Sequence, residues 1–224
     1  MTVVTHFPPI SLQTQAGPDS EVRRTRCRFV VPIEDPEAGT RVPDPIIRLL
    51  FMTSAPGFTC SCCGQSHAEL PMNYSATAPY YWDPSFTDTD DSLLSSDQCV
   101  IKAEHYFVKG LVEIPVIGSD DVFSWAVWVT LSRENFSRAA DMWETPGREA
   151  ESPYFGWLST ELSLYSPSTI NLKTHVHIRP VGQRPFIELE PTDHPLAVEQ
   201  RNGITLDRIR EIAEAVLHPT SEDT

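Results

Sequence analysis

Proline is the residue that most limits what this chain can fold into. The 224 residues contain 20 prolines and only 10 glycines. Each proline fixes one backbone angle and removes a hydrogen-bond donor, so prolines favour turns and interrupt helices. The sequence therefore predicts little helix and many fixed turns.

Strand patterns dominate the middle of the chain. Residues 99–103, 105–114 and 122–131 are rich in β-branched and aromatic side chains and are separated by turn-forming residues. Residues 170–178 alternate between apolar and polar side chains, and residues 185–190 form a further apolar run. Strands that precede helices, and do not alternate with them, indicate an α+β fold with an antiparallel sheet and a few helices on one face.

Two helices have recognisable caps. Ser132 precedes a segment with helical apolar spacing that runs to Trp143. Thr205 precedes an amphipathic C-terminal helix that ends near His218. Its apolar stripe consists of Leu206, Ile209, Ile212, Ala213 and Val216.

The length and patterning predict one domain with flanking segments. Residues 1–44 are polar and carry no sustained period, so we expect an N-terminal extension that is largely disordered. Residues 45–218 form the expected single α+β domain, and residues 219–224 a disordered tail.

A cysteine knuckle, defined here as Cys60 to His67, has the spacing of a metal site. Cys60 and Cys63 are separated by two residues, so a tight turn can direct both thiolates at one ion. Gly64 can adopt the left-handed conformation that such a turn uses. His67 lies close enough to be a third ligand, and the element is typical of a zinc knuckle.

Cys99 is the fourth ligand that the sequence favours, because it is the one remaining cysteine inside the expected domain. Together with Cys60, Cys63 and His67 it would form a closed tetrahedral set for a structural Zn²⁺ ion. The alternative is a group of buried, reduced thiols without metal.

Several motifs together resemble a known bacterial family. The chain is similar to domain-of-unknown-function family 2199 over about residues 58–218, and the resemblance implies a bacterial, cytosolic setting without an established activity. The motifs are Cys60-Ser61-Cys62-Cys63-Gly64 with His67, Leu70-Pro71, Ser96 to Cys99, Gly110 to Val116, Phe155 to Leu158, Arg184-Pro185, Asp193 to Ala197 and Gly203 to Thr205.

Charge limits the possible partners. With 31 acidic and 17 basic residues the formal net charge is -14, which repels nucleic acid and anionic membranes. A basic protein partner suits this charge, as in an immunity protein that inhibits a basic toxin. The acidic loop, defined here as Asp83 to Asp97, follows Tyr80, Tyr81 and Trp82 and is the candidate surface, the alternative being an ordinary solvated loop.

The sequence favours a cytoplasmic binding or regulatory domain over an enzyme. Residues 1–10 do not resemble a secretory signal, and no stretch reaches membrane-spanning length. We predict no catalytic residues. The alternative is a hydrolase or transferase that uses Cys99 or His194 in a cleft. His194 also suits a capping role, and His175 with His177 suits either a second metal or an exposed polar strand face.

Overall fold

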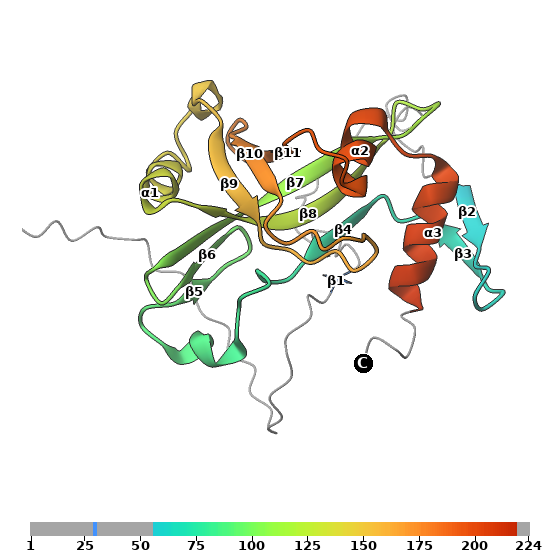
Figure 1. Ribbon diagram of the computed structural model, residues 1–224, viewed down its shortest axis with the longest axis horizontal. Helices are drawn as coiled ribbons and strands as arrows, with labels where there is room; N and C mark the ends of the chain where they lie inside the picture. Colours follow the sequence, from blue (N-terminus) through green and yellow to red (C-terminus); the bar gives the residue numbers. More distant parts are fainter. Residues whose placement is uncertain (1–28, 31–55, 219–224) are drawn as a thin grey trace, which may run out of the picture.

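The protein is described by a computed structural model that covers residues 29–30 and 56–218 (Figure 1). The predicted segment 1–44 lies outside the described residues, apart from one short strand. The strands are β1 (Phe29–Val30), β2 (Pro56–Thr59), β3 (Ser66–Glu69), β4 (Asn73–Ala76), β5 (Leu93–Leu94), β6 (Gln98–Ile101), β7 (His105–Pro115), β8 (Val122–Leu131), β9 (Tyr154–Leu158), β10 (Lys173–His177) and β11 (Phe186–Leu189).

Three α-helices are described, with one short 3₁₀ turn on each side of the first. They are α1 (Arg133–Asp141), α2 (Pro195–Asn202) and α3 (Leu206–Leu217), and the 3₁₀ turns are η2 (Pro84–Asp88) and η3 (Arg148–Ala150). The predicted caps are confirmed: the Ser132 side chain accepts from the Asn135 amide, and the Thr205 side chain accepts from the Arg208 amide.

The mixed α+β class is confirmed, but the expected sheet is different. Strands β7, β8, β9, β10 and β11 close on themselves, because β11 returns to β7 at one side while β8 pairs with β7 at the other. Most pairings are antiparallel, yet β4 runs parallel to β8 and β11 runs parallel to β7. The prediction of one antiparallel sheet is therefore wrong in these two pairings and in the closure.

Long strands explain the closure. The early part of β8 pairs with β4 at Ser124 to Ala126, whereas its later part pairs with β9 at Val129 and Thr130. A strand that changes neighbour along its length bends the sheet towards a closed barrel. Local alternation reports which face of a strand is buried, and it carries no information about this change of neighbour.

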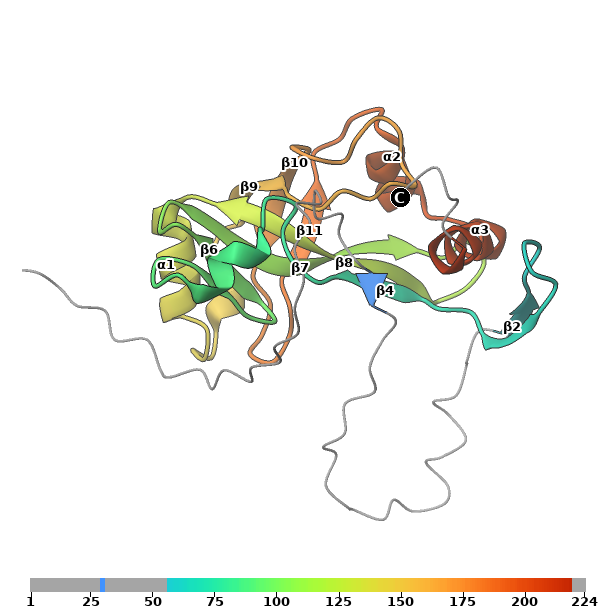
Figure 2. The same ribbon diagram turned by 90° about the horizontal axis from the view of Figure 1, so that it is seen from below.

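The helices also do not share one face. Figures 1 and 2 place α1 at one end of the barrel, while α2 and α3 lie at the opposite end. The separate two-stranded sheet of β2 and β3 lies beside α3 in both views.

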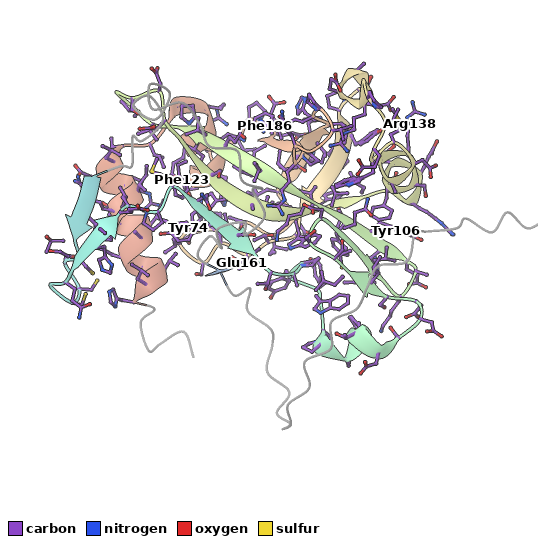
Figure 3. All side chains as sticks on the ribbon, turned by 180° about the vertical axis from the view of Figure 1, so that it is seen from behind. Tyr74, Tyr106, Phe123, Arg138, Glu161 and Phe186 are labelled. Atoms are coloured by element: carbon purple, nitrogen blue, oxygen red, sulfur yellow. The ribbon has the colours of Figure 1, made fainter. Side chains whose placement is uncertain are left out.

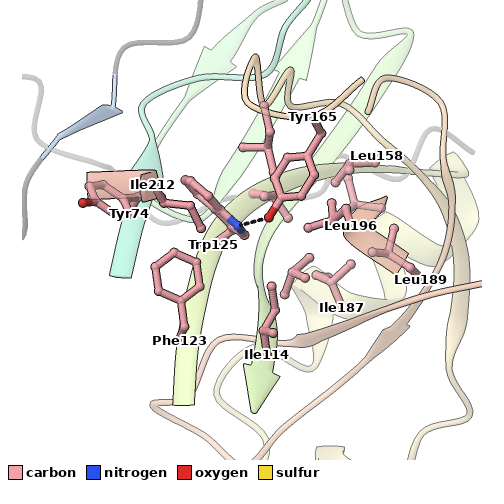
Figure 4. Close-up of a cluster of buried hydrophobic side chains, with 14 of the residues drawn as sticks. Tyr74, Ile114, Phe123, Trp125, Leu158, Tyr165, Ile187, Leu189, Leu196 and Ile212 are labelled. Atoms are coloured by element: carbon pink, nitrogen blue, oxygen red, sulfur yellow. Dashed lines mark hydrogen bonds between the residues drawn. The ribbon is translucent and has the colours of Figure 1, made fainter. Parts of the chain in front are cut away.

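One large core fills the barrel and continues under α2 and α3. Side chains from both helices, among them Leu196 and Ile212, are fully buried against barrel residues (Figure 4). In the same cluster the Trp125 Nε1 donates a hydrogen bond to the Tyr165 hydroxyl at 3.2 Å, drawn as a dashed line in Figure 4. The core therefore fixes where α3 lies relative to the barrel.

A polar chain joins the two helices to this core. The Tyr165 hydroxyl donates to the Glu199 carboxylate on α2 at 2.6 Å, and Arg208 on α3 donates to the same carboxylate at 2.8 Å. Burial, followed by the nearby Glu199 charge, raises the pKa of Tyr165 above its usual range. Tyr165 therefore stays a neutral donor, and α2 and α3 are held to each other through Glu199.

The side chains around the barrel are shown together in Figure 3, where Tyr106 and Arg138 mark the α1 end and Tyr74 and Phe123 the opposite half. At the α1 end, Arg138 forms a two-point ion pair with Glu151. Hydrogen bonds from Arg138 and then Tyr154 lower the pKa of Glu151 to about 2.

We predict that Gly156→Ala destabilises the protein by about 2–3 kcal/mol, because close packing at this point leaves no room for a side chain. A Cβ atom there would lie 2.3 Å from the Thr130 carbonyl oxygen, which is backbone and cannot move aside cheaply. The free energy of unfolding from urea denaturation measures the effect.

Gly182→Ala is the matched control. Gly182 has a φ of +85° and nothing within 4 Å of its added Cβ. This variant should lose about 1 kcal/mol from backbone strain alone. Equal losses in both variants would contradict the close approach of β9 to β8.

Candidate metal centre

The turn of the β2–β3 hairpin carries the cysteine knuckle. The Cys60 amide donates to the Gln65 carbonyl at 2.9 Å, and the Gly64 amide donates to the Cys60 carbonyl at 2.9 Å. Gly64 has a φ of +70°, the left-handed conformation expected from the sequence. The turn therefore folds back on itself and brings Cys60 and Cys63 to one side.

Four side chains converge at this turn. Cys60, Cys63, His67 and His218 each offer one ligand atom, and these atoms all lie within 4.8 Å of one another. His67 belongs to β3, whereas His218 is the C-cap of α3. In a tetrahedral zinc site two thiolates at 2.3 Å from the metal lie about 3.8 Å apart, so the four atoms need only a small contraction to bind an ion.

Two of these ligands carry buried nitrogens without a partner. The Nε2 atoms of His67 and His218 are inaccessible to solvent and have no hydrogen-bond partner within the part of the chain that is described. A buried polar atom left unpaired costs about 1–3 kcal/mol, so such atoms are rare in native proteins. Both atoms fit a bound metal ion, which accepts the lone pair of a neutral imidazole.

Contacts around the four ligands hold them in position. The Phe58 ring stacks on the His67 ring at 4.8 Å between centroids. Ser61, the residue after Cys60, donates from both its amide and its hydroxyl to the Glu214 carboxylate of α3, each at 2.6 Å. The hairpin and the end of α3 are thus in direct contact.

The turn also changes the acidity of the thiols. Burial raises the pKa of Cys60, but hydrogen bonds from the Cys63 and Cys62 amides and from the Cys63 side chain outweigh it and leave this pKa below its ordinary value. Cys62 is exposed and is not one of the four ligands, and partial desolvation by neighbouring residues raises its pKa. The thiolate is the metal-binding form, and of these two thiols Cys60 loses its proton more readily.

Cys99 lies outside this group. It is fully buried in a second hydrophobic cluster with Trp82, Phe107 and Trp128, and burial raises its pKa to about 12. Three of the four residues predicted as ligands, Cys60, Cys63 and His67, are brought together, and the fourth position is occupied by His218. Cys99 packs as a small apolar side chain.

The two strand histidines are paired with acids. His177 Nε2 lies 2.7 Å from a Glu188 carboxylate oxygen, and His175 Nε2 lies 3.8 Å from a Glu190 oxygen. Among residues 29–30 and 56–218, the one group of side chains that could hold a metal ion is that of Cys60, Cys63, His67 and His218. For His175 and His177, this favours the interpretation as an exposed polar strand face over a second metal site.

His194 is a helix cap. Its Nδ1 accepts from the Leu196 amide at 3.2 Å, and its Nε2 is 2.9 Å from the Pro167 carbonyl oxygen. The side chain is the N-cap of α2, as the capping interpretation predicts. Both ring nitrogens are engaged, which leaves neither available as a general base.

The acidic loop follows one buried and two exposed aromatic side chains. Trp82 is buried in the second cluster and packs edge-on against Phe86. Asp83 caps η2, and Asp97 pairs with Arg184 at 2.6 Å. Tyr80 and Tyr81, in contrast, are 41% and 47% exposed.

The comparisons identify a family and nothing narrower. A family profile with the description uncharacterised protein conserved in bacteria (DUF2199) matches residues 59–204. Neither a curated protein nor a solved structure matches the chain. None of the described helices is long and apolar enough to cross a membrane. Cys60, Cys63 and His67 fall within the matched range, and His218 follows it.

We predict that Cys99 resists alkylation. Because its pKa is about 12 and its side chain is fully buried, iodoacetamide at pH 8 should modify Cys99 at least about a hundredfold more slowly than the exposed Cys62. Mass spectrometry of the alkylated peptides measures both rates, with urea-denatured protein as the control. Similar rates in the folded protein would revive a thiol role for Cys99.

Proposed function

The chain belongs to this bacterial family, and on that premise we propose that it is a non-enzymatic binding domain whose fold is stabilised by one zinc ion. The proposed ligands are Cys60, Cys63, His67 and His218. The observation that carries the proposal is the pair of buried, unpartnered imidazole nitrogens beside two thiols.

The chemistry of the four ligands selects the metal. Two thiolates and two imidazoles suit Zn²⁺ and do not suit the oxygen-preferring ions Mg²⁺ and Ca²⁺. Four protein ligands complete a tetrahedron and leave no open position for a substrate or water. We therefore assign the ion a structural role.

The proposed ion would join distant parts of the chain. Ser61 in the knuckle and Glu214 on α3 are 153 residues apart in sequence, and the ligands lie beside them. A crosslink that closes a long loop gives the largest gain from restricting the unfolded chain. Zinc at this point would fasten the β2–β3 hairpin to α3.

The enzymatic alternative has less support. A hydrolase or transferase that uses Cys99 would need an accessible thiolate, whereas Cys99 is fully buried with a raised pKa. His194 would need a free ring nitrogen, whereas both are within hydrogen-bond distance of backbone atoms.

We place the binding surface at the acidic loop and the protein in the bacterial cytoplasm. The net charge of -14 favours a basic protein partner and speeds its association. Tyr80 and Tyr81 offer exposed rings just before the acidic loop, and the side chains of Asp88 and Asp90 within the loop are exposed. This combination of charge and rings is common in protein interfaces.

We expect purified protein to contain about one zinc ion per chain, measured by elemental mass spectrometry. His218→Ala should lose the metal and lower the melting temperature by about 5–10 °C, because the binding free energy of the ion no longer adds to folding. Chelator treatment of the wild type should lower it similarly.

Cys99→Ala is the matched control for that measurement. It should retain zinc, although the small cavity it leaves will reduce stability somewhat. Protein without zinc would overturn the proposed site. Loss of zinc in Cys99→Ala with retention in His218→Ala would assign the fourth ligand to Cys99.

For the acidic loop, we predict that Asp88→Asn with Asp90→Asn reduces capture of a basic protein from bacterial lysate at low salt. Glu144→Gln with Glu149→Gln removes the same charge from an exposed site elsewhere and should leave capture unchanged. Equal recovery with both double variants would remove the loop as a binding surface.

A further inference from the structure

We propose that Glu214 is a positioning residue for the metal centre, which holds the cysteine knuckle against α3 so that Cys60 and Cys63 face His218. This inference rests on the proposed zinc site. It concerns how the site is assembled, and it assigns a role to a carboxylate that does not bind the ion.

The position of Glu214 on α3 is the first argument. Glu214 and His218 are four residues apart, so they lie on the same side of the helix, one turn from each other. The backbone hydrogen bond from the His218 amide to the Glu214 carbonyl, at 2.9 Å, keeps that spacing up to the helix cap. One face of α3 therefore presents both a ligand and a hydrogen-bond acceptor to the knuckle.

The contact with Ser61 is the second argument. One carboxylate oxygen of Glu214 accepts from the Ser61 amide and the other accepts from the Ser61 hydroxyl, both at 2.6 Å. Hydrogen bonds to an ionised acceptor are short and stronger than neutral ones. Because Ser61 directly follows Cys60, this two-point contact fixes the backbone at the first ligand.

The hairpin needs such a contact. Within the described residues, the β2–β3 sheet has two strands and does not join the large sheet. An isolated two-stranded hairpin is marginally stable in water, so its turn must be held by contacts with the rest of the protein. Phe58, Cys60 and Leu70 fix its base by burial, whereas the turn beyond Cys60 is exposed and touches α3 through Ser61.

Glu214 is not itself a ligand in this arrangement. It is absent from the group of converging ligand atoms, and both its oxygens are occupied by Ser61. Partners that orient metal ligands typically contribute 10–100-fold to metal affinity. We expect a contribution of this size from Glu214.

The test measures zinc affinity by competition with a chromophoric chelator in the full chain. Glu214→Gln should weaken zinc binding about 10–100-fold. Glu211→Gln removes the same charge from an exposed position on the same helix and should change affinity less than about twofold. Equal losses in the two variants would show a general charge effect and overturn the proposal.

Ser61→Ala provides a milder second variant and closes a double-mutant cycle. If Glu214 acts through Ser61, the two substitutions together should weaken binding no more than Glu214→Gln alone. Losses that multiply would show that Glu214 acts independently of Ser61, which contradicts the proposed role.

Hydrogen exchange separates this inference from the zinc site itself. In chelator-treated protein, Glu214→Gln should speed exchange of the Ser61 amide, because that amide donates to the Glu214 carboxylate. A wild type that binds no zinc overturns both proposals. If the wild type and Glu214→Gln bind zinc equally tightly, only the proposed role of Glu214 is overturned.

Discussion

The pairing of β7 with β8 is the interaction on which the rest of the structure depends. The ladder runs from Tyr106 opposite Leu131 to Pro115 opposite Val122, and it is the longest in the described chain. Every other strand of the large sheet is attached to it directly or through a neighbour. Both strands are longer than their neighbours. At one end of the ladder β7 pairs with β6, and further along β7 pairs with β11 while β8 pairs with β4. The pairing of β11 with β7 allows the barrel to close.

The position of the candidate metal centre is a consequence of that geometry. The barrel core buries Ile209, Ile212 and Ala213 of α3, and each large apolar side chain buried there contributes about 1.5–3 kcal/mol. The same core buries Phe58 and Cys60 from the hairpin. The hairpin and the helix are thus positioned side by side by apolar packing, and the polar contacts between them refine an arrangement that burial has already imposed.

Local spacing made three of the four candidate ligands predictable. A turn that joins Cys60 to His67 is encoded in eight consecutive residues, and Gly64 marks its left-handed position. The fourth ligand depends on where α3 packs, which is set by contacts across the whole chain. The one feature of the sequence that could have indicated this ligand is the position of His218 at the end of the amphipathic C-terminal helix. Strand β9 was missed for a related reason, since Gly156 weakens its strand character but permits its close approach to β8.

The proposed metal site and the fold would depend on each other. Cys60 is buried and directly precedes Ser61, whose amide donates to the Glu214 carboxylate of α3. A Zn²⁺ ion would cancel the charge of two thiolates, and it would also bind the two imidazole nitrogens that have no hydrogen-bond partner among the described residues. Exposed Cys63 lies at the solvent side of the group, whereas Cys60 lies at its buried side. The ion would therefore reach the site from Cys63, and its binding would crosslink the β2–β3 hairpin to α3.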